Sequence, residues 1–263
     1  MYLIMNKITS RENKLIKYAA KLQNKSFRDS EKAFVIEGEK LFLEAVRFGV
    51  ELKSIFVSDE YSISSLPKLP KGYENITYIC PMDIIKKISQ TATPEGIVVI
   101  VHQFKIHDVN EIKQGRFLAL ENMSDPQNTG AIIRGAHAFG LSGIILTRSS
   151  ADVFSFKTIR ASMGSCFTLP IYLTDSINCL ITTIGKGFKF YAAALDDNAT
   201  ELENADFGDS SVVVIGNESK GITKETMELC ETLYINMQGT AQSLNAAVAA
   251  GIIAYKMSVK SPY

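Results

Sequence analysis

The stretch RFLALENMSDPQNTGAIIRGAHAFGLSGIILT (116–147) decides the fold class of its region. RFLALE (116–121) and GIILT (143–147) are apolar runs of strand length. Between them, TGAIIRGAHAFG (129–140) has the length of a helix and stops at Gly140. A strand, a helix and a second strand in this order predict an α/β fold with a parallel sheet covered by helices.

The same alternation continues toward the C-terminus. Further strands are predicted at FKFYAAAL (188–195), SVVVIG (211–216) and LYINM (233–237). A helix is predicted at about 222–231, and a long Ala-rich helix begins near Ser243. We therefore expect a C-terminal domain over residues 116–263.

The first part of the chain predicts a smaller α/β unit within residues 1–104. Residues 34–57 are typical of a strand, a helix and a strand. A strand at 76–80, a short helix at 82–90 and the strand GIVVIV (96–101) follow. KIHDVNEIKQG (105–115) is polar and poorly periodic, so it is the expected linker.

Composition excludes several classes of protein. The 263 residues are 46% hydrophobic and 21% charged, which is typical of a globular protein. No apolar run approaches the roughly 18 residues of a membrane span, and the opening MYLIM (1–5) is too short for a secretory signal. The four cysteines form no CxxC pair, so neither a zinc site nor a disulfide framework is expected. A reducing compartment, the cytoplasm, is the expected location.

The net charge of zero conceals an asymmetry. Residues 1–103 contain 15 basic and 12 acidic residues, and the rest contain 13 and 16. Basic residues near the N-terminus recur every three or four positions: Lys7, Arg11, Lys14, Lys17, Lys21, Lys25, Arg28 and Lys32. This spacing predicts one amphipathic helix, with a capping box at Thr9 and Glu12. Its cationic face is either simply solvated or a surface that contacts the phosphates of a nucleic acid.

Polar residues mark three strand–helix junctions. Asn128 and Arg134 follow the strand at 116–121, Glu218 follows the strand at 211–216, and Ser243 and Asn245 precede the last helix. Ligands bind at the carboxyl ends of strands in open α/β sheets. The alternatives are an arginine paired with a carboxylate, an acid in a plain turn and a serine that caps a buried helix.

A nucleoside triphosphate site is not expected. GNESKGIT (216–223) has the outline of a phosphate-binding loop, but Lys220 precedes Gly221 instead of following it.

Four blocks in the second half resemble one family in order and spacing. They are ENMSDPQNTGAIIRGAHAFG (121–140), RASMGSCFTLPI (160–171), VVVIGNESKGI (212–222) and INMQGTAQSLNAAVAAGI (235–252). Together they resemble the SpoU (TrmH-type) RNA ribose 2′-O-methyltransferases of the SPOUT superfamily. EGEKLFLEAV (37–46) and TATPEGIVVIV (91–101) resemble the substrate-binding domain of this family, a ribosomal-protein-like RNA-binding fold.

The resemblance implies S-adenosylmethionine as methyl donor, a deep trefoil knot in the C-terminal domain, pairing into a homodimer and no metal. The catalytic residues that it implies are Asn128, Arg134, Glu218, Ser243 and Asn245. The implied cofactor-binding residues are Gly216, Asn217, Ile235, Met237 and Leu244. An RNA substrate favours phosphate contact by Lys7, Arg11, Lys14, Lys17, Lys21 and Lys25.

Arg134 is the central residue of the expected mechanism. A guanidinium is effectively always protonated, so we expect it to bind the neighbouring phosphate and stabilise negative charge on the ribose oxygen rather than act as a base. Asn128 would orient Arg134 or the hydroxyl, and the other polar residues would complete the pocket by hydrogen bonding. The chain departs from the family at Asn236, where proline is usual, and at 246–247, where Val-Ser is common.

The expected function is 2′-O-methylation of RNA, with ribosomal RNA favoured over transfer RNA. The alternative from another class is a non-catalytic RNA-binding or ribosome-assembly factor on the same fold. The retention of Arg134 and Asn245 argues against it. The target nucleotide stays open, as does a role in antibiotic resistance.

Overall fold

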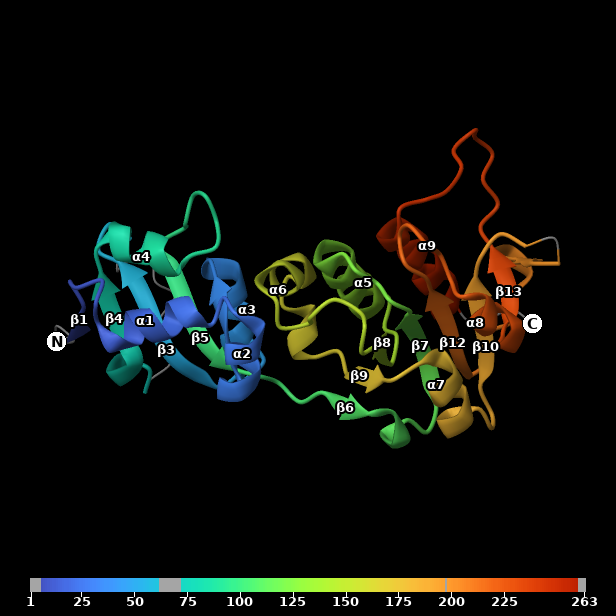
Figure 1. Cartoon of the computed structure of the whole chain (residues 1–263), viewed down its shortest axis with the longest axis horizontal. Coiled ribbons are helices and arrows are strands. Elements are labelled where there is room, and N and C mark those ends of the chain that lie inside the picture. The colour runs from blue at the N-terminus through green and yellow to red at the C-terminus, as the bar shows by residue number, and fades with distance from the viewer. Residues whose placement is uncertain (1–5, 62–71, 197, 260–263) are drawn as a thin grey trace. The chain divides into compact units, whose positions relative to one another are not determined.

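The computed structural model describes residues 6–61, 72–196 and 198–259, so the opening MYLIM lies outside the described residues (Figure 1). Its contacts divide the chain into two units. The first consists of Met1–Phe104 with Phe154–Phe167, and the second of Lys105–Val153 with Thr168–Tyr263. Both units are α/β, as the alternation of apolar runs predicts.

The first unit is built on a mixed sheet of five described strands in the order β1-β4-β3-β5-β2. β5 is antiparallel to both β2 and β3, and the other pairs are parallel. Its strands are β1 (Asn6–Lys7), β2 (Ala33–Glu37), β3 (Leu52–Ser58), β4 (Thr77–Cys80) and β5 (Ile97–His102). Its helices are α1 (Lys14–Lys21), α2 (Lys25–Glu31), α3 (Glu39–Arg47), α4 (Met82–Ile88) and α6 (Phe156–Ser162).

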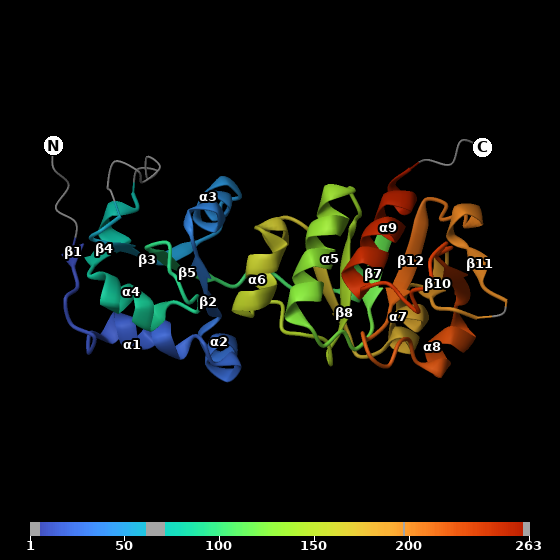
Figure 2. The ribbon, with the colours of Figure 1, turned by 90° about the horizontal axis from the view of Figure 1, so that it is seen from above.

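Alternating side chains of the strands fill a core on each face of this sheet. Val98 and Ile100 of β5 join the cluster that α1 and α4 cover, on the face opposite α3 (Figure 2). On β2, the Phe34 ring contacts the rings of Phe154 and Phe104, whose centroids lie 5.4 and 6.1 Å away. The segment around α6 therefore belongs to the core of the first unit, although it overlaps the second of the four sequence blocks, at 160–171.

The prediction of one continuous N-terminal helix is wrong. Asn13 caps α1 through the Leu15 amide, and Asn24 caps α2 through the amides of Ser26 and Phe27. An asparagine that accepts from the backbone two or three residues ahead starts a new helix, so the basic row is divided into a strand and two short helices. The expected capping box at Thr9 and Glu12 is replaced by the Asn13 cap.

The second unit contains an entirely parallel sheet of eight described strands in the order β11-β13-β10-β12-β7-β8-β9-β6. Its strands are β6 (His107–Asp108), β7 (Gly115–Leu120), β8 (Gly143–Thr147), β9 (Ile171–Thr174), β10 (Lys189–Ala193), β11 (Thr200–Glu201), β12 (Ser210–Ile215) and β13 (Glu231–Tyr234). Its helices are α5 (Pro126–Ala138), α7 (Ile177–Ile184), α8 (Lys224–Leu229) and α9 (Ala246–Ser258). The five strands expected in this region are present as β7, β8, β10, β12 and β13, and the three expected helices as α5, α8 and α9, each within a few residues of its predicted bounds.

This unit also contains elements that the sequence analysis did not predict, among them β6, β9 and α7. Residues 105–115, the expected linker, contain β6, which pairs with β9 in parallel. Sequence reasoning also missed β9 and α7, because the helical residues of α7 follow the short strand without a glycine or proline to separate them.

Close packing of α5 against α9 brings two distant segments together (Figure 2). A Cβ on Gly135 would lie 4.0 Å from the Gly251 Cα, so the two backbones meet where both side chains are absent. Ala250 and Ala254 of α9 are fully covered. The small residues of the last helix therefore serve packing within the chain. No helix in the described part of the chain is long and apolar enough to cross a membrane.

Candidate active site at the carboxyl edge of the parallel sheet

The polar junctions predicted from the sequence meet at one edge of the second unit. Because the strands are parallel, the loops that follow β7, β10, β12 and β13 all leave the sheet at the same edge. The chain after β7 continues into α5, and the chain after β13 continues through residues 235–245 into α9.

A chain of side-chain hydrogen bonds joins three of these segments. Asn128 Nδ2 donates to Glu218 Oε1 at 3.1 Å, and Asn245 Nδ2 donates to Asn128 Oδ1 at 3.1 Å. These residues lie 90 and 117 positions apart in sequence. The structure therefore brings Asn128, Glu218 and Asn245 together, and it uses both ends of the Asn128 amide to do so.

Glu218 also holds the start of α5. Its carboxylate accepts from the Asp125 amide at 3.2 Å, the Ser124 amide at 3.4 Å and the Ser124 hydroxyl at 3.1 Å. Partial burial raises the pKa of the Glu218 carboxyl. The hydrogen bonds from its own amide, from Asn128 and from the two loop amides outweigh that effect, so this pKa lies below its ordinary value. Glu218 is therefore a charged acceptor, not a plain turn acid.

The turn that carries Glu218 depends on a close backbone approach. Asn217 and Gly221 exchange backbone hydrogen bonds of 3.1 and 2.9 Å. A Cβ on Gly216 would lie 2.4 Å from both Gly221 C and Ile222 N, so only glycine fits there. The Asn217 side chain accepts from the Ser219 and Lys220 amides and closes the turn.

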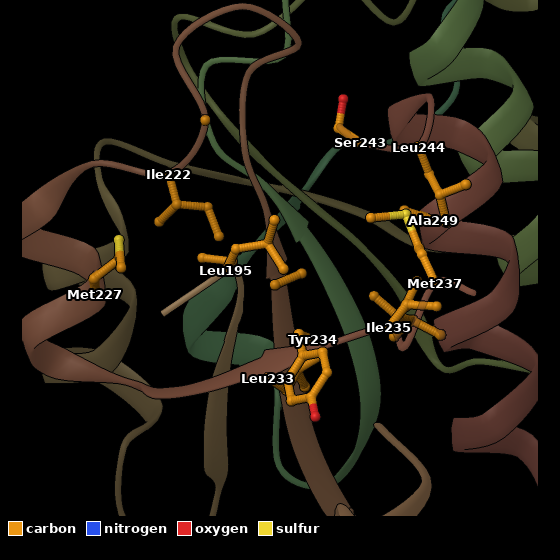
Figure 3. Close-up of a pocket in the computed structure, with 14 residues that line it drawn as sticks. Leu195, Ile222, Met227, Leu233, Tyr234, Ile235, Met237, Ser243, Leu244 and Ala249 are labelled. Carbon is orange, nitrogen blue, oxygen red and sulfur yellow. The ribbon is translucent and has the colours of Figure 1, made fainter. Parts of the chain in front are cut away.

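An apolar cavity of about 360 Å³ opens beside this turn. It contains three of the expected cofactor residues, Ile235, Met237 and Leu244, and the expected catalytic residue Ser243. Figure 3 shows Ile222 and Met227 on one side of it and Met237, Leu244 and Ala249 on the other. The carboxyl ends of β10 and β13 complete the wall. Gly216 and Asn217 do not line the cavity, but Gly221 does, and it is bonded to the Asn217 backbone and lies close to the Gly216 backbone.

Arg134 stands apart from the hydrogen-bonded chain. Its side chain is exposed on α5, and among the described residues it has neither a hydrogen bond nor an ion pair. The alternative of a carboxylate-paired arginine therefore fails. The expectation that Asn128 orients Arg134 also finds no contact here, because Glu218 and Asn245 occupy the Asn128 amide. The helix cap of α9 is Asn245, which accepts from the Ala247 and Val248 amides, and not Ser243.

The expected RNA-contacting residues all lie in the first unit and are exposed: Lys7, Arg11, Lys14, Lys17, Lys21 and Lys25. Three of them pair with carboxylates, since Arg11 contacts Asp83, Lys17 contacts Glu12 and Lys25 contacts Asp29. Arg28, from the same basic row, is instead buried and donates to the Leu22 and Gln23 carbonyls.

Sequence reasoning missed two polar residues of this edge. Ser124 contacts Glu218, and Glu121 is a buried carboxylate directly after β7. The position of Glu121, a charge that ends a buried apolar strand, was the signal that could have identified it.

Asn236, which replaces the usual proline, donates to Glu201 at 2.8 Å. Within the described ranges, no three His, Cys, Asp or Glu side chains gather as metal ligands.

The geometry agrees with comparisons against known proteins. Residues 115–255 match the model of the SpoU rRNA Methylase family, which is more than half of the chain. The chain belongs to the SpoU rRNA methylase family. Residues 13–99 match the MRM3-like substrate binding domain. The family expected from the four sequence blocks is thus confirmed.

Three known proteins resemble this chain along nearly its whole length. The Bacillus subtilis 23S rRNA (guanosine(2553)-2′-O)-methyltransferase RlmP is 32% identical, over 96% of this chain and 99% of its own. The Streptomyces viridochromogenes 23S rRNA (uridine(2479)-2′-O)-methyltransferase is 27% identical, over 95% and 91%. The AdoMet-bound rRNA methyltransferase from Sinorhizobium meliloti is 29% identical, with a TM-score of 0.82, over 96% and 97%.

The lowered pKa of Glu218 predicts a pH-dependent contribution to stability. A carboxyl whose pKa is lower in the folded state stabilises the fold while ionised, and this contribution is lost as pH falls through the folded pKa. We expect Glu218→Gln to lower the melting temperature at neutral pH and to differ less from the parent as the pH falls to about 3. Thermal unfolding over that range measures this. Glu228→Gln, at an exposed site on α8, is the matched control, and a difference that stays constant on acidification contradicts the prediction.

Proposed function

We propose that this chain transfers a methyl group from S-adenosylmethionine to a ribose 2′-hydroxyl of ribosomal RNA. The observation that carries the proposal is the Asn245–Asn128–Glu218 chain of hydrogen bonds beside the apolar cavity, in a member of the SpoU rRNA methylase family. The relatives with named targets match both units and act on 23S rRNA. We therefore propose 23S rRNA as the substrate in preference to transfer RNA, and the cytoplasm as the place where it is met.

The cavity suits the methyl donor in size and in chemistry. S-Adenosylmethionine supplies a methyl group that is activated by a positively charged sulfur. Ile222, Met227 and Met237 provide apolar surface for a ring and a thioether-like chain. Ile235 and Leu244 also line the cavity, and main-chain groups of these residues would hold the donor without a dinucleotide-type glycine loop.

The polar residues in and around the cavity have separate roles in the proposed transfer. Asn128, fixed at both ends of its amide, holds the start of α5 against the 216–221 turn and keeps the edge of the site rigid. Arg134 has an exposed guanidinium without a carboxylate partner in the described chain, so it is available for the RNA phosphate and for negative charge on the ribose oxygen. Ser243 lines the cavity and can donate one hydrogen bond there.

A methyl-incorporation assay on 23S rRNA tests the proposal. The parent chain is expected to transfer label from S-adenosylmethionine to a ribose, with the guanosine modified by the Bacillus relative as the first position to map. Arg134→Lys is expected to keep donor affinity and to lose turnover by about 100-fold or more, because lysine cannot form the bidentate contact. Transfer of no label by the parent supports the non-catalytic alternative, and full activity of Arg134→Lys refutes the role of Arg134.

We further propose that the exposed lysines of α1 contact RNA phosphates. Lys14 and Lys21 lie seven residues apart on this helix, so they share a face, and neither has a carboxylate partner among the described residues. Lys21 lies 5.8 Å above the Phe27 ring. Exposed cations without a carboxylate partner release counterions from a polyanion when they bind its phosphates.

Reversal of these charges is expected to weaken RNA binding. Lys14→Glu with Lys21→Glu should reduce the slope of log affinity against log salt by about 1 to 2, since each lost phosphate contact removes close to one unit. Filter binding at several salt concentrations measures the slope. Lys113→Glu with Lys186→Glu, two exposed lysines of the second unit, is the charge-matched control. Equal slopes in the two double variants contradict the assignment.

We infer that two copies of the chain pair through α9. Three apolar residues recur along one exposed face of this helix, with exposed fractions of 51% at Val248, 39% at Ile252 and 58% at Tyr255, and Val259, 47% exposed, follows directly after its end. Positions that are three or four residues apart lie on the same side of a helix, so they form one strip. Phe139 of α5 extends the strip through an edge contact with Tyr255. Contiguous exposed apolar surface of this kind is typical of an interface.

A charge placed in this strip is expected to separate the copies. Ile252→Glu should shift the sedimentation coefficient from dimer to monomer, because an unpaired carboxylate cannot be buried at the contact. Leu229→Glu, at an exposed apolar residue of α8 away from the strip, controls for the added charge. A parent that sediments as a monomer contradicts the dimer, and a dimeric Ile252→Glu contradicts the choice of face.

The trefoil knot implied by the family resemblance belongs to the same proposal. The path of the chain after β13 supports it. β13 lies next to the edge strand β11, and from there the chain returns to α9, which contacts α5 and the central strand β7.

A further inference from the structure

A buried carboxylate lies behind the cavity, outside the residues assigned to catalysis or to the donor. Glu121 is 5% exposed and directly follows β7. Its amide donates to the Ile215 carbonyl at 2.9 Å, which extends the β7–β12 pairing by one residue. The Glu121 side chain is therefore anchored at the point where the catalytic edge begins.

Three donors from one segment converge on this carboxylate. The Thr223 amide lies 2.8 Å from Oε2, the Thr223 hydroxyl 2.9 Å from Oε1 and the Thr226 hydroxyl 2.6 Å from Oε1. Thr226 is itself 3% exposed. Buried carboxylates are expensive unless they are fully hydrogen-bonded, so this arrangement fixes the segment tightly to the sheet.

The segment that Glu121 holds is one wall of the cavity. Thr223 follows Ile222, and Thr226 precedes Met227, and both Ile222 and Met227 line the cavity (Figure 3). Thr223 is also the cap of α8. At its other end, the same loop is closed by the bonded pair of Asn217 and Gly221. The position of this wall therefore depends on two fixed points, and Glu121 provides the one inside the protein.

We propose that Glu121 is a positioning residue for the methyl donor: it sets the distance between the Ile222–Met227 wall and the opposite wall of the cavity. This inference rests on the proposed function of the cavity. Glu121 lies outside the cavity lining, so its effect passes through Thr223 and Thr226. Loss of the carboxylate weakens donor binding more than it slows transfer, because Asn128 and Arg134 stand on a different segment.

The test compares Glu121→Leu with Glu37→Leu. Glu37 is a buried carboxylate of the first unit, 8% exposed, which accepts from the Ser89 hydroxyl, the Thr91 hydroxyl and the Gln90 amide. It matches Glu121 in burial and in donors but has no part in the cavity. Calorimetric titration with S-adenosylmethionine gives the dissociation constant, and steady-state assays give KM and kcat, each measured below the unfolding transition of the variant.

The expected result is a dissociation constant raised about tenfold or more by Glu121→Leu, with kcat at saturating donor within about threefold of the parent. Glu37→Leu should leave donor affinity within about twofold, and Glu121→Gln should restore most of it, because the amide oxygen still accepts from Thr223. Unchanged donor affinity in Glu121→Leu, or a loss in kcat alone, overturns the proposal.

A milder variant covers the case in which Glu121→Leu does not fold. Thr226→Val keeps the shape of a side chain that is 3% exposed and removes one hydroxyl donor to Glu121. It should raise the dissociation constant about threefold, and unchanged affinity overturns the proposal. If the parent chain does not bind S-adenosylmethionine, the proposed function fails. If the parent binds it and the variants bind equally well, only the role of Glu121 fails.

Discussion

The side-chain amide of Asn128 is the contact on which the carboxyl edge of the parallel sheet depends. One end of it donates to Glu218 and the other accepts from Asn245, so a single group joins the start of α5, the turn after β12 and the start of α9. Glu218 then holds the loop before α5, and Asn245 holds the first turn of α9. Because Glu218 and Asn245 also accept hydrogen bonds from backbone amides, the three segments form one rigid edge.

The proposed site combines two surroundings of different chemistry. Ile222, Met237 and Leu244 line an apolar cavity, which we propose holds the methyl donor. Arg134 is exposed on α5 without an intramolecular partner in the described residues, and we propose that it binds a phosphate. Transfer of a methyl cation to an oxygen requires both surroundings within a short distance, because the donor needs exclusion of water and the acceptor needs positive charge.

The first unit shows how periodicity can mislead. The basic residues near the N-terminus are spaced as in one helix, yet Asn13 and Asn24 each begin a new helix by binding the backbone ahead. Arg28 consequently turns inward to two carbonyls. The position of Phe154 was also beyond sequence reasoning, since contact with Phe34 joins residues 120 positions apart, and local patterns contain no information about such a pair.

The sequence by itself determined the alternation of strands and helices, the parallel sheet and the family, because apolar periodicity and motif spacing are local properties. It also identified Asn128, Glu218 and Asn245 as polar residues at strand–helix junctions. Only the tertiary structure decided that Asn128 bonds to both of the others, that Arg134 lies outside this chain of bonds and that Glu121 holds the cavity wall. These outcomes depend on which loops lie next to one another at the edge of the sheet. The strand order determines which loops are neighbours, and local sequence does not.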